Sequence, residues 1–177
     1  MGKCCSAFGH SNFYANVHDV LQDIISTLVR EQEVTVFMTG GMGDFDSMFC
    51  QAVREIKAQN KEIKLILVKP YFSNELNTNR EYYNTFFDDV VIPNELLDVH
   101  YKSAIQKRNQ WMVDRSEFVI AGVYRDFGGA FQTIQYASKA GKKVIDIKKI
   151  SSQFLTRKRL LFLRRTKAST KKLGGSR

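Results

Sequence analysis

The sequence predicts an α/β protein with three layers (α/β/α) around a mainly parallel sheet. Apolar, β-branched segments alternate with segments of helical period, and glycine turns follow two of the predicted strands. This alternation is typical of parallel sheets, whose crossover connections place helices on both faces. Ligands in such folds bind beyond the carboxyl ends of the strands, so we expect a functional site at that edge.

The elements of the first half follow one another without long interruptions. An apolar run predicts a strand at residues 3–8, and apolar positions spaced i, i+3, i+4 predict a helix at 14–31. The same two patterns predict a strand at 34–39, a helix at 45–56 and a strand at 63–69, which Pro70 ends.

The second half continues the alternation. A helix at 75–87 and a short strand at 89–92 are expected, followed by an irregular stretch after Pro93. Beyond it we expect a helix at 103–115, a strand at 118–123, a helix at 129–140 ended by Gly141, and a strand at 143–147.

The composition divides the chain into a neutral body, residues 1–150, and a basic C-terminal tail, residues 151–177. Nine of the 27 Lys and Arg residues and none of the 18 Asp and Glu residues lie in the tail, so the body holds 18 of each. Such a tail attracts polyanions, and nonspecific binding of nucleic acid through it is one expectation; a solvated tail that aids solubility is the other. The body is large enough for one packed domain.

Composition also bears on the compartment and on cofactors. No apolar run reaches the length of a membrane span, and the first residues lack the layout of a signal peptide, so a cytoplasmic protein is expected. The three cysteines form no C-x-x-C pair and the three histidines have no ligand spacing, so we expect free thiols, no metal and no cofactor. The many Phe and Tyr residues leave a homo-oligomer possible.

The first glycine turn, residues 39–43, contains Gly40, Gly41 and Gly43 and leads into a helix. It is neither a Walker A loop, because no Gly-Lys-Ser/Thr follows, nor G-x-G-x-x-G, because Asp46 replaces the third glycine. Asp44 and Asp46 lie in the first helical turn, where they would repel a phosphate. Asp44 is interpreted as a helix cap; Asp46 either caps the helix or binds ribose hydroxyls.

The second glycine turn, residues 127–129, opens a helix with Gly128 and Gly129 and without an acid in its first turn. Backbone N–H groups at such a helix start bind phosphate, so this turn is the better phosphate site, and Thr133 adds a hydroxyl. The alternative is a tight strand-to-helix connection.

Other candidate ligand residues lie on the helix at 103–115 and after the first strand. Arg108 falls inside the apolar stripe of that helix, so its guanidinium needs an internal carboxylate or a ligand phosphate. Asn109 beside it could serve a base or a ribose, and Gly9 and His10 follow the first strand at the ligand edge.

Four motifs, taken together, resemble the SLOG superfamily: Phe8-Gly9-His10, Thr39 to Asp46, Gln106 to Asp114, and Phe127 to Thr133. The resemblance covers residues 3–148. Within the superfamily, the chain resembles the small bacterial and phage-associated SLOG proteins of uncharacterised function more specifically. It implies a Rossmann-like fold that binds or senses a nucleotide or nucleotide-derived ligand. Relatives include the Lonely Guy phosphoribohydrolases and proteins of the DprA type.

The resemblance places Gly9, Gly40, Gly41, Gly43, Gly128, Gly129, Arg108 and Asn109 on pocket positions. The phosphoribohydrolases carry Pro-Gly-Gly-x-Gly-Thr-x-x-Glu with a catalytic Glu, and Gln135 stands at that position here. Because Gln is neither an acid nor a base, binding without turnover is favoured. A nucleotide N-glycosidase is the alternative, with Asp46 or Asp114 replacing the Glu. A nucleic-acid-binding protein acting through the tail is the third hypothesis.

Overall fold

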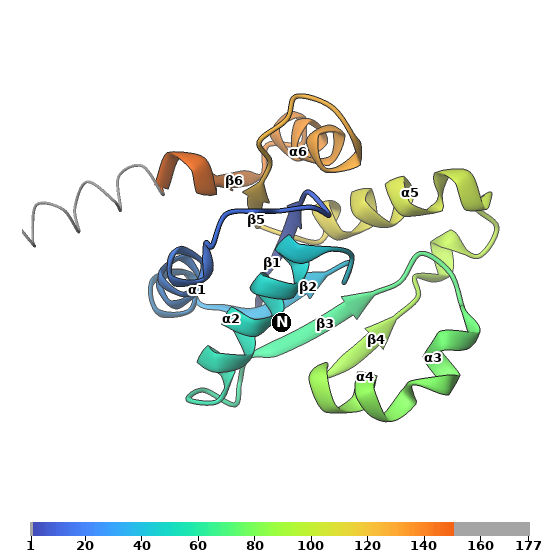
Figure 1. The fold of residues 1–177 in the computed structure, drawn as a ribbon, viewed down its shortest axis with the longest axis horizontal. Coiled ribbons are helices and arrows are strands. Elements are labelled where there is room, and N and C mark those ends of the chain that lie inside the picture. The colour runs from blue at the N-terminus through green and yellow to red at the C-terminus, as the bar shows by residue number, and fades with distance from the viewer. Residues whose placement is uncertain (1, 151–177) are drawn as a thin grey trace, which may run out of the picture.

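The computed structural model describes residues 2–150, and its six strands form one parallel sheet in the order β4-β3-β2-β1-β5-β6 (Figure 1). Helices cover both faces, so the predicted α/β/α class is confirmed and the fold is Rossmann-like. The basic tail, residues 151–177, and the predictions made for it lie outside the described residues.

The elements agree closely with those predicted. The strands are β1 Lys3–Gly9, β2 Val34–Thr39, β3 Lys64–Val68, β4 Asp89–Val91, β5 Phe118–Gly122 and β6 Lys143–Asp146. The helices are α1 His18–Gln32, α2 Asp44–Lys57, α3 Asn74–Thr78, α4 Arg80–Phe86, α5 Tyr101–Asp114 and α6 Gly129–Lys139, with a 3-10 turn η1 at Asn94–Leu96.

Two predicted helices are corrected. The helix expected from residue 14 begins at His18, because the preceding loop packs on the body: Phe13 lies against Phe45, with ring centroids 5.3 Å apart, and Val17 is buried. The single helix expected at 75–87 is two short helices that meet at Asn79.

The order of strands along the chain reverses at β1. One edge of β1 pairs with β2, where Cys5 is opposite Phe37, and its other edge pairs with β5, where Cys5 is opposite Phe118. The helices that follow β1 and β5 therefore leave toward opposite faces, which opens a crevice at the carboxyl ends of these strands. Both glycine turns lie at this edge.

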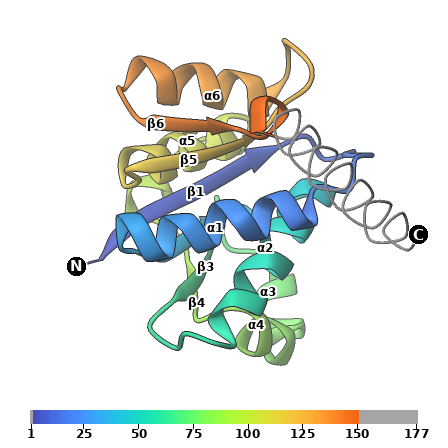
Figure 2. The same ribbon diagram turned by 90° about the vertical axis from the view of Figure 1, so that its left-hand side faces the viewer.

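Two apolar cores hold the layers together. On one face, α1 and α2 pack on the sheet through residues such as Leu21, Ile25 and Phe49, all fully buried. On the other face, α5 and α6 pack through Met112, Val113 and Ala137. Figure 2 shows α1 in front of β1. The helices that follow β1 and β2 therefore share one face, and α5 and α6 share the other.

None of the helices within residues 2–150 is long and apolar enough to cross a membrane.

Candidate functional site

A cavity of about 240 Å³ lies at the carboxyl edge of the sheet where the strand order reverses, and we call it the central cavity. It is bounded by the end of β1, the first glycine turn, the start of α2, the middle of α5 and the start of α6. Its lining residues are Phe8, Gly9, Ser11, Gly40, Met42, Asp46, Ile105, Arg108, Asn109, Gly129 and Ala130. Segments far apart in sequence therefore meet here.

Arg108 carries the only guanidinium among the residues that line the central cavity, and only 3% of Arg108 is exposed to solvent. Its Nη1 donates to the carbonyl oxygen of Val68 at 2.7 Å, and its Nη2 lies 3.6 Å from the sulfur of Met42. Its Nε is buried without a hydrogen-bond partner among the described residues.

Within residues 2–150, the charge of Arg108 makes no direct ion pair. Burial lowers its pKa, and the Asp46 carboxylate acts in the opposite direction. None of the ion pairs within residues 2–150 includes Arg108, so Asp46 acts on it across a longer distance than in a direct ion pair. A guanidinium stays protonated in proteins, so the cavity wall carries a buried positive charge that the Asp46 carboxylate offsets only from a distance.

Asn109 is held in place by α6. Its Nδ2 donates to Thr133 Oγ1 at 3.0 Å, and that hydroxyl donates to the Gly129 carbonyl at 2.7 Å. Asn109 lines the central cavity, whereas the Thr133 hydroxyl is engaged within the protein. Thr133 thus positions Asn109, and its predicted contact with a ligand stays a prediction.

The start of α6 is open toward the central cavity. No side chain caps it, its first turn contains no acid, and its first backbone bond runs from the Gln132 N–H to the Gly128 carbonyl. The amides of residues 129–131 precede that bond and are the free donors of the helix. A Cβ at Gly129 would meet nothing within 4 Å, so the space next to these amides is empty of protein.

The first glycine turn is filled from inside the protein. A Cβ at Gly40 would lie 2.7 Å from Cζ of Arg108, and one at Gly41 would lie 2.6 Å from Leu67. At Gly43 it would meet the backbone of Ser11, and at Gly9 it would meet the Phe45 ring. These predicted ligand glycines therefore have an internal packing reason to be glycine.

Asp46 is 7% exposed and fastens the first glycine turn. Its Oδ2 accepts the Met42 N–H at 2.8 Å, and the Thr39 hydroxyl and the Gly41 amide also stabilise the carboxylate. Burial is the largest effect and raises the pKa of Asp46 to about 6. These hydrogen bonds come from the turn before α2 and not from the free amides of the helix. The capping and the ribose interpretations both stay predictions.

Asp44 was expected to cap α2, and this interpretation is wrong. Its side chain accepts the N–H of Phe13 at 3.1 Å, and its own N–H donates to the Ser11 carbonyl at 2.8 Å. The N-cap position belongs to Gly43, which makes no side-chain hydrogen bond. Asp44 thus ties the loop after β1 to α2.

His10 lies beside the central cavity rather than on its wall. Its Nε2 accepts the N–H of Arg125 at 3.2 Å, and its ring meets Tyr124 edge to face at 4.4 Å. Burial and the positive charges of Arg125 and Lys148 lower its pKa. Of the other predicted residues, Gly41, Gly43, Gly128 and Thr133 also lie outside the set that lines this cavity.

The sequence did not single out Ser11, Met42, Ile105 and Ala130 as site residues, although all four line the central cavity. Three of them lie within two residues of a predicted glycine. Ile105 precedes Arg108 by three positions, which places both on one side of α5. Closeness in sequence to a predicted glycine or to Arg108 was therefore the signal that could have identified these four residues.

Gln135, at the position of the catalytic Glu, and Asp114, one of its two proposed replacements, lie away from the central cavity, whereas the other replacement, Asp46, lines it. Gln135 is exposed on α6. Asp114 ends α5 and accepts a hydrogen bond from the Tyr136 hydroxyl at 2.8 Å, in a hollow bounded by Lys3, Phe118 and Lys143. Those three residues begin strands, so Asp114 lies at the amino edge of the sheet and cannot act on a ligand in the central cavity.

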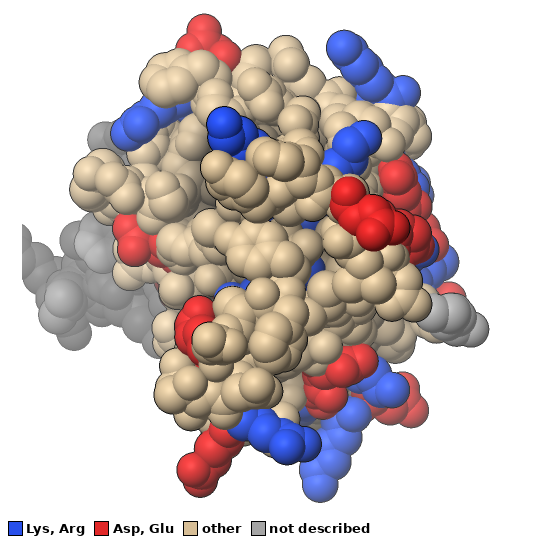
Figure 3. All heavy atoms as spheres, turned by 90° about the vertical axis from the view of Figure 1, so that its right-hand side faces the viewer, with Lys and Arg blue, Asp and Glu red and all other residues tan. Residues whose placement is uncertain are grey.

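The face of the molecule where β3 ends is mostly uncharged over its centre, where Lys or Arg atoms show only in small hollows, and most charged side chains lie toward its margin (Figure 3). The body therefore presents no broad basic surface on this side, in keeping with the balanced charge of residues 1–150.

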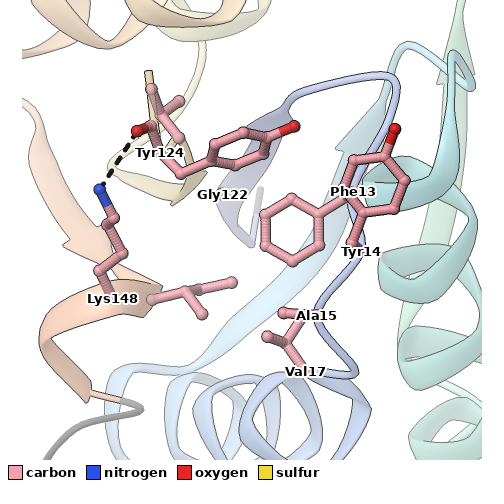
Figure 4. A pocket seen from close by; sticks show the side chains of 9 residues that line it. Phe13, Tyr14, Ala15, Val17, Gly122, Tyr124 and Lys148 are labelled. Carbon is pink, nitrogen blue, oxygen red and sulfur yellow. Dashed lines mark hydrogen bonds between the residues drawn. The ribbon is translucent and has the colours of Figure 1, made fainter. Parts of the chain in front are cut away.

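A separate apolar cavity of about 390 Å³ lies between the loop after β1 and the ends of β5 and β6. Phe13 and Tyr124 point into it from opposite segments, and Lys148 closes one side by donating to the Tyr124 carbonyl at 3.4 Å (Figure 4). Its walls are almost entirely apolar, and none of the predicted site residues lines it.

Within residues 2–150, no three His, Cys, Asp or Glu side chains gather in a way that could hold a metal ion. Cys4, Cys5 and Cys50 are free thiols.

The family model described as YspA SLOG family (YpsA) matches residues 9–159. The chain belongs to this family. Its relative YoqJ, an uncharacterized SPbeta prophage-derived protein of Bacillus subtilis strain 168, is 26% identical over an alignment of 136 residues that covers 68% of this chain and 80% of YoqJ. The resemblance inferred from the four motifs is thereby confirmed.

Two solved structures of DNA processing protein A (DprA) share the fold. The Streptococcus pneumoniae protein has a TM-score of 0.55 and 18% identity, and the Helicobacter pylori protein has 0.55 and 14%. Each match covers 82% of this chain but only 50% and 65% of the respective DprA chain, so the shared fold spans only part of each DprA chain. The H. pylori structure is described as showing a single-stranded DNA binding mode.

Proposed function

We propose that the protein binds or senses a nucleotide or nucleotide-derived ligand, whose phosphate lies at the start of α6. The observation that carries the proposal is the open N-terminus of α6, which faces a cavity that also contains the unpaired, buried charge of Arg108. Free amides at a helix start and a guanidinium are the two groups that proteins use most readily for phosphate.

The contrast between the two helix starts favours α6 over α2. In α2, Asp44 and Asp46 occupy the first turn, and the Asp44 amide already donates to Ser11. In α6, the first turn lacks acids, and Gly129 leaves the approach to the amides open. A phosphate would thus meet donors at α6 and carboxylates at α2.

Gly129→Ala is the test that separates ligand binding from folding. A Cβ at residue 129 meets nothing in the protein, so the variant should keep the wild-type free energy of unfolding within about 0.5 kcal/mol. The same methyl group occupies the space beside the α6 amides. We expect the Kd for AMP, measured by calorimetry, to rise at least tenfold, about 1.4 kcal/mol.

Ser138→Ala is the matched control, because Ser138 is exposed on the same helix and outside the central cavity. It should leave the Kd unchanged. Arg108→Ala is a less clean test, since it also removes the donor to the Val68 carbonyl. If no nucleoside monophosphate binds the wild-type protein, and none co-purifies with it in native mass spectrometry, the proposal fails.

A second candidate function is hydrolysis of a nucleotide N-glycosidic bond, and Asp46 is the observation that favours it. Its pKa of about 6 and its place on the cavity wall suit a general acid or base near neutral pH. Release of free base from AMP, lost in Asp46→Asn, would support this candidate. If the protein binds AMP but releases no free base over hours, this candidate is excluded and the protein only binds its ligand.

Nucleic-acid binding is a third candidate, favoured by the basic tail and by the single-stranded DNA binding described for H. pylori DprA. Replacing Arg157, Lys158, Arg159, Arg164 and Arg165 by Gln in the full-length protein should weaken salt-sensitive binding of single-stranded DNA and leave the Kd for AMP unchanged. Absence of DNA binding by the wild-type protein at low salt would exclude this role.

A further inference from the structure

A second polar cavity, of about 210 Å³, adjoins the first glycine turn on the side away from α5, and we call it the side cavity. It lies between α2, the end of β3 and the pair α3–α4. Asp46 belongs to the walls of both cavities, and neighbouring glycines of the turn, Gly40 and Gly41, line the central and the side cavity respectively. A ligand that extends past the turn from the central cavity would reach the side cavity.

The side cavity contains flat rings together with hydrogen-bonding groups of both kinds. Tyr82 and Tyr83 contribute rings whose centroids are 5.4 Å apart at 80°. Lys69 supplies an ammonium group 5.5 Å from the centroid of Tyr83. Glu75 supplies a carboxylate, which already accepts the Tyr83 hydroxyl at 2.7 Å and retains further lone pairs.

Cations in the side cavity are not paired with carboxylates. Lys69 and Arg54 are absent from the ion pairs within residues 2–150, and each lies over an aromatic ring instead. The two cations are balanced by Glu75 and Asp46, so the cavity has little net charge. This balance makes it a poor second phosphate site, and its polar lining makes it a poor site for an aliphatic group.

We propose that the side cavity is the nucleobase subsite, so that a nucleoside 5′-monophosphate places its phosphate at α6 and its base between α2 and α4. This inference rests on the proposed function. A nucleobase is flat and carries donors and acceptors on its edge. The half-exposed Tyr82 ring can stack on one face of a base, and charged groups such as Lys69 and Glu75 can bind its edge. The base then confers selectivity, and the phosphate confers affinity common to all nucleotides.

The test compares AMP, GMP, CMP and UMP with ribose 5-phosphate, which has the phosphate and the sugar but no base. The Kd of the tightest nucleotide should be at least tenfold lower than that of ribose 5-phosphate. In Lys69→Gln and in Glu75→Gln, the nucleotide Kd should rise at least tenfold, whereas the Kd of ribose 5-phosphate should stay within twofold.

Lys64→Gln and Glu81→Gln make the same chemical changes at exposed positions outside the side cavity and should alter neither Kd. The inference is overturned if ribose 5-phosphate binds as tightly as the nucleotides, or if the cavity variants weaken both ligands equally. It is also overturned if inorganic phosphate binds at two sites per chain and Lys69→Gln removes one, which would make the side cavity an anion site. If the wild-type protein binds neither the nucleotides nor ribose 5-phosphate, the proposed function itself is refuted.

Discussion

Gly43 and Gly128 occupy the same position in two helices but have opposite surroundings. Each is an N-cap, with φ 96° and ψ −178° at Gly43 and φ 91° and ψ 174° at Gly128, a conformation that glycine alone adopts readily. A Cβ at Gly43 would crowd the Ser11 backbone, with the carbonyl oxygen 2.8 Å away, whereas one at Gly128 would meet nothing within 4 Å. Similar glycine turns thus serve different purposes. Other protein segments fill the space around the first turn, whereas the space around the second turn contains no protein atoms.

Gly43→Ala should have the largest effect, because it combines the conformational cost with crowding of the backbone. We expect a loss of about 4 kcal/mol in the free energy of unfolding, against about 2 kcal/mol for Gly128→Ala, which has only the conformational cost. Urea denaturation of both variants measures the difference. Equal losses in the free energy of unfolding would mean that the Ser11 backbone moves to accommodate the new Cβ, and the contrast between the turns would disappear.

The pH dependence of stability should report the buried carboxylate of the first turn. Because the folded-state pKa of Asp46 is raised to about 6, the folded protein binds more protons than the unfolded chain between about pH 4 and pH 6, so stability falls as pH rises through this window. A shift of this size corresponds to a loss of about 3 kcal/mol by pH 7. Asp46→Asn should remove this fall.

Asp44→Asn is the matched control for that titration, since Asp44 lies in the same helical turn but is exposed. It should keep the wild-type dependence on pH. Unfolding free energies between pH 4 and pH 7.5, measured for the three proteins, test the assignment; an unchanged slope in Asp46→Asn would show that another group titrates.

Thr133→Val should have the smallest effect and refine the account of the open turn. The variant keeps the shape of the side chain but removes the acceptor for Asn109 and the donor to the Gly129 carbonyl. We expect a stability loss of about 1 kcal/mol and a severalfold rise in the Kd for AMP as Asn109 loses its orientation. A Kd equal to that of the wild type would limit Thr133 to a role within α6.

The order of elements was predictable because it depends on local patterns. Periodicity placed β2 at 34–39 and α2 and α6 within a residue or two, and the burial of Arg108 followed from its place in an apolar stripe. The start of α1 was not predictable, because Val17 is buried by packing of the loop and not by a helix. The break at Asn79 likewise carried no local signal strong enough to divide the predicted helix.

The sequence by itself determined the α/β class, the family and the edge of the sheet where both glycine turns lie, because alternating periods and turn residues act over short distances. Tertiary structure decided which glycines are open and which are filled, since a turn does not reveal that Ser11, Leu67 or Arg108 will arrive from elsewhere in the chain. It also decided that Asp114 lies at the opposite edge from Asp46. Those outcomes depend on how distant segments pack, and no local pattern encodes them.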